Sequence, residues 1–507
     1  MQTLTRLLNL PEPAFAAKIR LPLIALFGIS LTWTITSVKP VSAAGVVGNG
    51  TPASCTEAAL ETALAGGGNV VFNCGSSPTT ILVTREKVIA ANTVIDGSTN
   101  GKNLITLSGG GKARIFSTKN NVELTVRNLT VANGFTTNDG GAIYNGFRGK
   151  LTINNCKFNN NVSTKAGEFS GGGAIATLSE STIIIRNSTF TGNKAGNGGA
   201  INNVLSDLEV TNSTFTGNQS VRSGSGGGGG AIYIDGAKAN NGKIIIRAST
   251  FTNNTAVFQG GAIFNQLYNT STTTIQNSTL SGNRVTGTGN QGFGGGIFAS
   301  SNSPNAVLTV ANTTLSGNTA SNQGGGLWSG NNATVTIINS TVFGNQAVSA
   351  DGKGGLGGGI MRANGNINIT NSTIAGNSAG FQGGGIVGGT ATKVTNVIIA
   401  NNIAKNGGNN WNIKNNCFDP LSNGGNNLQF APTNPNDKEC GAGITTANPL
   451  LGSLANDGGG GSTQTLALLA GSPAINAGNN SVCPKTDQRG VARPQGGVCD
   501  IGAFEAK

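Results

Sequence analysis

NSTFTGNKAGNGGAIN, residues 187–202, is the stretch that decides the fold, because close copies of it recur along most of the chain. The stretch joins two phrases. The first, Asn-Ser/Thr-x-apolar-x-x-Asn, returns as NSTFTGN at 212, NSTLSGN at 277, NTTLSGN at 312, NSTVFGN at 339 and NSTIAGN at 371. The second, Gly-Gly-Ala/Gly-Ile/Leu, ends at Ile143, Ile175, Ile201, Ile232, Ile263, Ile297, Leu327, Ile360 and Ile386. With looser copies included, the apolar residue of the first phrase returns after about 30 residues, and such a period predicts a stacked-repeat architecture.

Each period contains three short pieces with the character of β-strands. Examples are Lys243-Ile-Ile-Ile246, the Ser-Thr-Phe of the first phrase and the Gly-Ala-Ile of the second. All are too short for helices, and β-branched residues dominate the first piece. Glycine and asparagine separate the pieces and suit turns that need left-handed backbone angles. We therefore predict an all-β, right-handed parallel β-helix with three strands per coil.

Stacking explains why the phrases repeat. A single coil cannot bury its own apolar face, so neighbouring coils have to cover it. We expect Phe190, Phe215 and Phe251 to form one inner ladder, and the isoleucines of the second phrase to form another. The recurring asparagines should form a ladder of amides that bond up and down the stack.

The two ends of the solenoid need closure, because an exposed strand edge invites aggregation. Ser54-Cys-Thr-Glu57 has the pattern of a capping box and precedes a short amphipathic segment, AALETALA, that ends at Gly66. We predict a capping helix there. The expected division is a signal peptide at 1–43, an N-terminal cap with the first coils at 44–127, the repeat β-helix at 128–402 and a C-terminal closing region at 403–507.

The N-terminus has the features of an export signal. Arg6, Lys18 and Arg20 are followed by an uncharged, mostly apolar stretch from Leu21 to Val38 and by small residues up to Ala43. This order predicts a signal peptide that is cleaved near Ala43. An uncleaved anchor is the alternative, because the apolar stretch is of borderline length for spanning a membrane. No second long apolar run follows, so we expect no integral membrane segment after cleavage and a secreted or cell-surface location.

The chain is basic, with a formal net charge of +12. The predicted signal carries Arg6, Lys18, Arg20 and Lys39 against Glu12, a net +3, which leaves +9 for the rest. A basic exported protein can favour acidic polysaccharides or an anionic cell-surface partner. The basic residues are scattered, so we expect no nucleic-acid partner. We also expect a monomer.

Six of the seven cysteines lie in pairs that are close in sequence. An exported chain permits disulfides, and the spacing favours pairs of neighbours, although sequence alone leaves other pairings open. The expected pairs are Cys55 with Cys74, Cys417 with Cys440 and Cys483 with Cys499.

Two parts of the chain resemble known families. Phe190-Thr-Gly-Asn193 with Gly198-Gly-Ala-Ile201 resembles the paired FxxN and GGA[ILV] repeats of the chlamydial polymorphic outer-membrane proteins, over about 128–402. GSPAINAGNN and TDQRGVARPQGGVCDIGAFE, within 471–505, resemble the choice-of-anchor Q domain of exported bacterial proteins. The resemblance implies a pectate-lyase-like solenoid, a surface location and adhesin-like roles. Because Lys507 follows the closing motif almost at once, we expect a released or loosely held protein.

The residues offer little for catalysis. The chain contains no histidine, which removes His-based triads, His metal sites and His general bases. Acids within the repeats are dispersed, and we predict no metal and no cofactor. Asp207 and Glu209 share one strand face, and paired carboxylates for glycoside hydrolysis could still meet across coils. The acids in question are Asp139, Glu168, Glu180, Asp207, Glu209, Asp235 and Asp351.

The densest set of charges lies near the C-terminus. One interpretation is a carbohydrate or ion site, and the other, which we favour, is an ion-paired fastener for the final coil. The set consists of Asp487, Arg489, Arg493, Asp500 and Glu505.

Aromatic residues recur at one position of the second phrase. The residue after its inward isoleucine should point outward, because side chains alternate along a strand. Stacked coils would align these residues as a stripe that binds a polysaccharide or a partner surface. The alternative is that the stripe stacks on itself or is covered by a loop or by the C-terminal region. The aromatic members are Tyr144, Tyr233, Phe264, Phe298 and Trp328.

The sequence therefore favours an exported, surface-associated or secreted adhesin-like binding protein without catalysis. The first alternative is a carbohydrate-active enzyme, either a polysaccharide lyase or a glycoside hydrolase, on the same scaffold. The second is a structural protein of the extracellular matrix, which burial of the aromatic stripe would favour.

Overall fold

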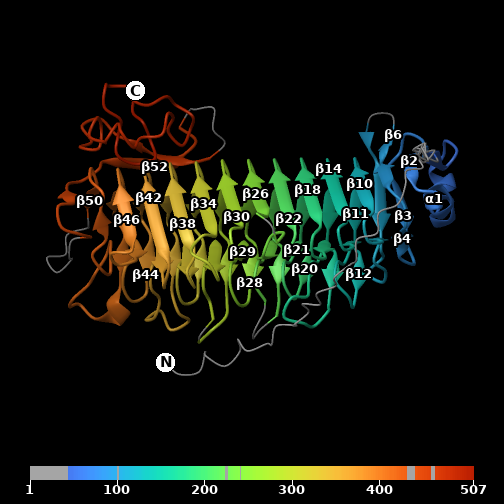
Figure 1. Cartoon of the computed structure of the whole chain (residues 1–507), viewed down its shortest axis with the longest axis horizontal. Helices are drawn as coiled ribbons and strands as arrows, with labels where there is room; N and C mark the ends of the chain where they lie inside the picture. The colour runs from blue at the N-terminus through green and yellow to red at the C-terminus, as the bar shows by residue number, and fades with distance from the viewer. Residues whose placement is uncertain are drawn as a thin grey trace, which may run out of the picture. The chain divides into compact units, whose positions relative to one another are not determined.

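The computed structural model describes residues 44–99, 102–222, 227–239, 241–289, 291–430, 440–457 and 463–507, all within one compact unit. The predicted signal peptide, 1–43, lies outside the described residues. Figure 1 shows the unit as a row of stacked coils in which strands of successive coils lie side by side. Among the described residues, no helix has the length and apolar character needed to cross a membrane.

Four parallel sheets, numbered here in the order in which a coil visits them, run along the stack. In the described part of the chain, sheets 1 and 2 have fourteen strands each. Sheet 1 contains β1 (Ala44–Val47), β2 (Gly68–Phe72), β5 (Thr93–Asp96), β10 (Glu123–Arg127), β14 (Lys150–Asn154), β18 (Thr182–Arg186), β22 (Asp207–Thr211), β26 (Lys243–Arg247), β30 (Thr272–Gln276), β34 (Val307–Ala311), β38 (Thr334–Ile338), β42 (Asn366–Thr370), β46 (Thr392–Thr395) and β49 (Ser422–Asn423). Sheet 2 contains β3 (Thr79–Leu82), β8 (Ile105–Ser108), β11 (Thr130–Ala132), β15 (Lys157–Asn159), β19 (Thr189–Thr191), β23 (Thr214–Thr216), β27 (Thr250–Thr252), β31 (Thr279–Ser281), β35 (Thr314–Ser316), β39 (Thr341–Phe343), β43 (Thr373–Ala375), β47 (Ile398–Ala400), β50 (Leu428–Phe430) and β51 (Thr445–Thr446).

The other two sheets complete each coil. Sheet 3 contains β12 (Phe135–Thr136), β16 (Val162–Ser163), β20 (Lys194–Ala195), β24 (Gln219–Ser220), β28 (Thr255–Ala256), β32 (Arg284–Val285), β36 (Thr319–Ala320), β40 (Gln346–Ala347), β44 (Ser378–Ala379) and β48 (Ile403–Ala404). Sheet 4 contains β4 (Lys87–Ile89), β9 (Phe116–Thr118), β13 (Ile143–Asn145), β17 (Ile175–Thr177), β21 (Ile201–Val204), β25 (Ile232–Asp235), β29 (Ile263–Leu267), β33 (Ile297–Ser301), β37 (Leu327–Gly330), β41 (Ile360–Arg362) and β45 (Ile386–Val387). Two antiparallel pairs stand apart, β6 (Ser98–Thr99) with β7 (Lys102–Asn103) and β52 (Leu451–Ala455) with β53 (Thr465–Leu468). The helices in the described ranges are α1 (Glu57–Leu64) and two short 3-10 turns, Pro52–Ser54 and Asn406–Gly408.

This architecture confirms the predicted right-handed parallel β-helix. Sheet 3 adds a two-residue strand to the three strands predicted for each coil. The addition has a local cause. Gly192 adopts a φ of 64° directly after β19, and this left-handed residue bends the chain so that Asn193 turns inward before β20 begins.

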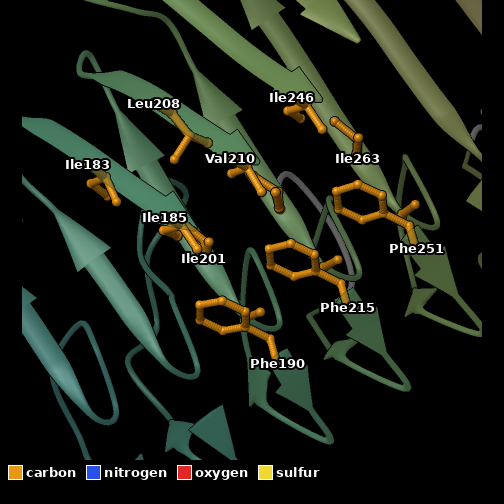
Figure 2. Close-up of a cluster of buried hydrophobic side chains, with 14 of the residues drawn as sticks. Ile183, Ile185, Phe190, Ile201, Leu208, Val210, Phe215, Ile246, Phe251 and Ile263 are labelled. Carbon is orange, nitrogen blue, oxygen red and sulfur yellow. The ribbon is translucent and has the colours of Figure 1, made fainter. Parts of the chain in front are cut away.

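The core consists of ladders in which equivalent residues of successive coils lie in register. Phe190 pairs with Phe215, and Phe215 with Phe251, along sheet 2. Their rings stack with centroids 4.7 Å apart, and Figure 2 shows them beside the isoleucines of sheets 1 and 4. All three side chains are fully buried. The predicted inner ladder of phenylalanines is therefore confirmed.

A second ladder consists of buried asparagine side chains between sheets 2 and 3. Each Nδ2 donates a hydrogen bond of 2.9 Å to the Oδ1 of the next asparagine along the stack. Asn254 also donates from Nδ2 to the carbonyl oxygen of Phe215, and its Oδ1 accepts from the backbone N–H of Asn218. The predicted amide ladder is confirmed, and its members are Asn161, Asn193, Asn218, Asn254, Asn283, Asn318, Asn345, Asn377 and Asn402.

The predicted capping helix is present, but its N-cap differs from the prediction. Thr56 is the N-cap, and its hydroxyl accepts from the N–H of Ala59 at 3.2 Å. Ser54 instead ends the 3-10 turn and binds the N–H of Asn49. The capping-box interpretation was wrong, because Pro52 starts a 3-10 turn that includes Ser54. Ser54 therefore lies two residues before the N-cap of α1. The carboxylate of Glu57 bonds to Thr84, Arg85 and Lys87 of the first coils.

The asparagine ladder should contribute strongly to stability. Replacing Asn254 with alanine would leave a buried N–H and a buried carbonyl without partners, at about 1–3 kcal/mol each. We expect N254A to lower the free energy of unfolding by about 2–4 kcal/mol, measured from urea unfolding midpoints. The control is N212G, which removes an exposed amide and keeps a residue that tolerates the φ of 48°. Equal losses in both variants would contradict a special role for the buried ladder.

Candidate functional site

The outward side of sheet 2 presents rows of hydroxyl groups. On β19, β23, β27 and β31 the central residue is buried and the two flanking residues face outward. Threonine follows threonine in register from coil to coil, so two rows run along the stack at a spacing of ~4.8 Å. We call this surface the hydroxyl face; it consists of Thr189, Thr191, Thr214, Thr216, Thr250, Thr252, Thr279 and Ser281.

The strands of the hydroxyl face and of the neighbouring sheet 3 carry positive charge without carboxylates. No aspartate or glutamate stands on the described strands of sheets 2 and 3. Lys157 on β15, Lys194 on β20 and Arg284 on β32 are exposed and form no ion pair with any described residue. The outward face of sheet 1 differs, because it carries carboxylates, several of which pair with cations across coils, as Glu209 does with Arg186 at 2.8 Å.

Two shallow hollows border the hydroxyl face. The first has a volume of about 180 Å³ and lies at the corner with sheet 1; its lining includes Ser213, Thr214, Ala248, Ser249, Thr250 and Thr279. The second has a volume of about 470 Å³ and lies at the corner with sheet 3; its lining includes Asn253, Ser281, Gly282, Phe343, Gly344 and Leu454.

The same hydroxyl rows continue beneath the C-terminal segment 463–505, which lies along the side of the solenoid. Figure 1 shows this segment, in red, beside β52. Thr314 donates to the carbonyl oxygen of Gln464 at 2.6 Å, and Thr341 donates to the side-chain oxygen of Gln488 at 2.7 Å. Thr373 accepts from the N–H of Ala503.

Apolar residues replace the threonines where this segment packs most closely. Ile398 and Ala400 occupy the outward positions of β47 and are buried. They form one cluster with Leu468, Ile501 and Phe504. Sheet 2 therefore has a covered part, whose outward residues are buried threonines and apolar residues, and an open part, the hydroxyl face.

The aromatic stripe is aligned as predicted, but most of it is buried. Tyr233, Phe298 and Trp328 are only 4%, 3% and 7% exposed, so these members of the candidate binding stripe offer little surface to solvent. Tyr144 and Phe264 are half-buried. The rings stack on one another, with centroids 4.5 Å apart for Tyr233 and Phe264 and 4.6 Å apart for Phe298 and Trp328.

A second layer covers the stripe. The outward aromatic residues pack against side chains from the turns that precede sheet 4 and from the C-terminal region, namely Phe293, Leu356 and Phe418. The ring of Phe293 stacks on Trp328 with centroids 5.3 Å apart. This arrangement is the self-stacked and covered alternative, and it leaves little aromatic surface for a ligand.

The C-terminal charged cluster is assembled inside the closing segment. Arg489 pairs with Asp487 at 2.7 Å and Arg493 with Glu505 at 3.0 Å, and all four side chains are buried. Asp500 accepts hydrogen bonds from the N–H groups of residues 476 and 506. Burial raises the pKa of the Asp500 and Glu505 carboxyl groups above their ordinary values. The contacts fit the fastener interpretation, because each charge binds another part of the same segment.

The three predicted disulfides are confirmed. Cys55 bonds to Cys74, Cys417 to Cys440 and Cys483 to Cys499. The first pair closes the cap around α1, and the last pair lies beside the charged cluster.

The acids of the repeats mostly serve as links between coils. Asp139 pairs with Lys165 at 2.6 Å, and Glu209 pairs with Arg186, while the neighbouring Asp207 accepts from the N–H of Lys243. No group of three or more possible metal ligands exists among the described residues.

Asp235 differs from these acids, because it is buried and pairs with no cation of the described part of the chain. The Tyr268 hydroxyl donates to its Oδ1 at 2.5 Å. Burial raises the pKa of Asp235, and the charge of Glu168 adds to this effect, while the bond from Tyr268 opposes it. A carboxyl group that is protonated more readily than usual could act as a general acid.

Comparison with known proteins supports the repeat assignment. The family described as the Chlamydia polymorphic membrane protein repeat matches residues 187–204, 212–235 and 248–266. The resemblance of these repeats is therefore confirmed, whereas the resemblance of 471–505 to the choice-of-anchor Q domain stays a prediction. No curated protein matches the chain.

Two solved structures are similar to this chain at low identity. Tailspike protein 3 of bacteriophage CBA120 shares 12% identity over 77% of this chain, with a TM-score of 0.39, and this chain spans only 59% of the tailspike chain. Pectate lyase Pel9A shares 13% identity over 92% of this chain and 98% of its own, with a TM-score of 0.33.

Burial of the stripe can be measured by tryptophan fluorescence. In W33F/W411F, Trp328 is the sole tryptophan, and we expect several-fold weaker quenching by acrylamide than in W33F/W328F. The reason is that the second variant retains Trp411, which is 64% exposed, whereas Trp328 is 7% exposed. Equal quenching in the two variants would show that Trp328 is open to solvent.

Proposed function

We propose that the protein is an exported, surface-associated or secreted adhesin-like protein that binds acidic polysaccharide without catalysis, through the hydroxyl face. The observation that carries the proposal is the open part of sheet 2: among the described strands of sheets 2 and 3, two rows of hydroxyl groups lie beside cations that have no ion-pair partner, and no carboxylate occurs. The surface location is supported by the matched repeat, which is described as one of a membrane protein. The signal peptide and the monomeric state are parts of this proposal.

The chemistry of the face fits a sugar chain with negative charges. Hydroxyl groups both donate and accept hydrogen bonds, as the hydroxyls of sugars do. An elongated polymer that follows the stack would meet an equivalent pair of hydroxyls every ~4.8 Å, so many weak contacts would add up. Lys157, Lys194 and Arg284 would attract its carboxylates over a longer range.

The two alternatives each have one supporting observation. The buried Asp235 with its Tyr268 partner favours a carbohydrate-active enzyme. Burial of the aromatic stripe favours a structural matrix protein. An assay of polymer length separates the first alternative from the proposal, because binding alone leaves polygalacturonate at its original size. Shortening that disappears in D235N would establish the enzyme.

Charge reversal beside the hydroxyl face should weaken binding of the acidic polymer. We expect K194E/R284E to weaken binding of polygalacturonate by about tenfold or more, equivalent to about 1.4 kcal/mol, in a binding assay at low salt. The matched control is K243E/K393E, which makes the same change of charge at two exposed lysines of sheet 1. Equal weakening in both variants would show attraction by net charge alone, and unchanged binding in K194E/R284E would remove the hydroxyl face as the site.

A further inference from the structure

The side chain of Gln488 shows what the hydroxyl rows of sheet 2 can bind. Its oxygen accepts from the Thr341 hydroxyl at 2.7 Å, and its nitrogen donates to the Thr314 hydroxyl at 2.9 Å. The nitrogen also donates to Thr463 and to the carbonyl oxygen of Gln464. Two threonines of adjacent coils thus hold one amide group between them, one as donor and the other as acceptor.

The same pair of hydroxyls recurs along the hydroxyl face. Thr279 lies in register with Thr314, Thr250 with Thr279, and Thr214 with Thr250. Each neighbouring pair can therefore donate to the oxygen and accept from the nitrogen of one amide, as Thr341 and Thr314 do. Unlike Thr314, the three threonines from 214 to 279 are only partly buried, so a ligand can reach them.

One position beside these threonines departs from the repeat. The corner before sheet 2 carries asparagine in most coils, as at Asn187 and Asn212, whose side chains bond to each other at 2.7 Å. At this corner the next coil has Ala248, which is exposed and has a φ of 46°. Left-handed angles cost alanine about 1 kcal/mol, and such strain is retained mainly where it serves a function.

Ala248 gives the smaller hollow a place for a methyl group. Ala248 lines the hollow of about 180 Å³ together with Thr214 and Thr250. The hollow therefore combines the apolar side chain of Ala248 with two hydroxyl groups that can bind an amide. An acetamido group has this composition, since it joins a methyl group to an amide.

We infer that the hydroxyl face recognises the acetamido groups of N-acetylated amino sugars in a glycan. This inference rests on the proposed function and names the class of ligand. A glycan is favoured over a polypeptide, because the chain's own C-terminal segment contacts apolar outward residues such as Ile398 in addition to the threonines it binds on sheet 2. The hydroxyl face offers threonine and serine instead, and its cations favour a glycan that also carries carboxylates.

Two matched oligosaccharides test the inference. The pentamer of β-1,4-linked N-acetylglucosamine and the pentamer of β-1,4-linked glucose share a backbone and differ in the acetamido group. We expect calorimetric titration to show at least about tenfold tighter binding of the acetylated pentamer, as one pair of well-made hydrogen bonds provides. Polygalacturonate, which lacks amides, measures the proposed function separately.

Two variants locate the preference. T250V keeps the shape of the side chain and removes its hydroxyl. A248N fills the hollow and restores the residue that the repeat has elsewhere, so it should raise the thermal midpoint of unfolding while it weakens binding of the acetylated pentamer. We expect both variants to lower the preference for the acetylated pentamer over the glucose pentamer to within about twofold, with binding of the glucose pentamer as the internal reference.

Each other outcome overturns a defined part of the account. Equal binding of the two pentamers, with polygalacturonate still bound, would overturn the acetamido inference and leave the proposed function standing. Failure of all three ligands to bind would overturn both. A preference that survives in T250V and A248N would place the acetamido site elsewhere and overturn the inference.

Discussion

The hydrogen bond between one buried asparagine amide and the next is the constraint on which the rest of the structure depends. Each of these amides satisfies a backbone N–H, a backbone carbonyl and two neighbouring side chains inside the turn between sheets 2 and 3. A slip of one residue in any coil would break several of these bonds in the low-dielectric interior, where unpaired polar groups are costly. Register is therefore specified in every coil, and residues at equivalent positions form straight rows on the outside as well as the inside.

The repeat period made much of this predictable. The alternation of Thr189, Phe190 and Thr191 indicates which side chain enters the core, and the register of the phenylalanines follows from the copies of the phrase. The same alternation was the signal for the hydroxyl face, since it places threonine outward on both sides of each phenylalanine. Sequence reasoning followed the apolar residues of the phrase and missed the polar rows that the same strands present.

The cover over the outer surfaces was harder to predict, because it depends on contacts between distant segments. Alternation correctly places Trp328 outside the coil, but its burial comes from Phe293 and the stacked rings of neighbouring coils. The place where the C-terminal segment packs had a local signal, the change from threonine to Ile398 and Ala400 at outward positions of sheet 2. The sequence places Arg489 and Arg493 in one charged cluster with several acids. Only the structure determines which acid forms an ion pair with each arginine.

The faces of the solenoid thus differ in what they leave available. Stacked rings cover part of the outer side of sheet 4, several ion pairs link coils across sheet 1, and the C-terminal segment covers the last part of sheet 2. The open part of sheet 2 keeps hydroxyls and unpaired cations accessible. The central claim, that this open part binds the glycan, is tested most directly by NMR of protein labelled at the threonine methyl groups. With polygalacturonate, the account predicts shifts at Thr189, Thr214, Thr250 and Thr279; shifts confined to the outward threonines of sheet 1, such as Thr274 and Thr309, would contradict it.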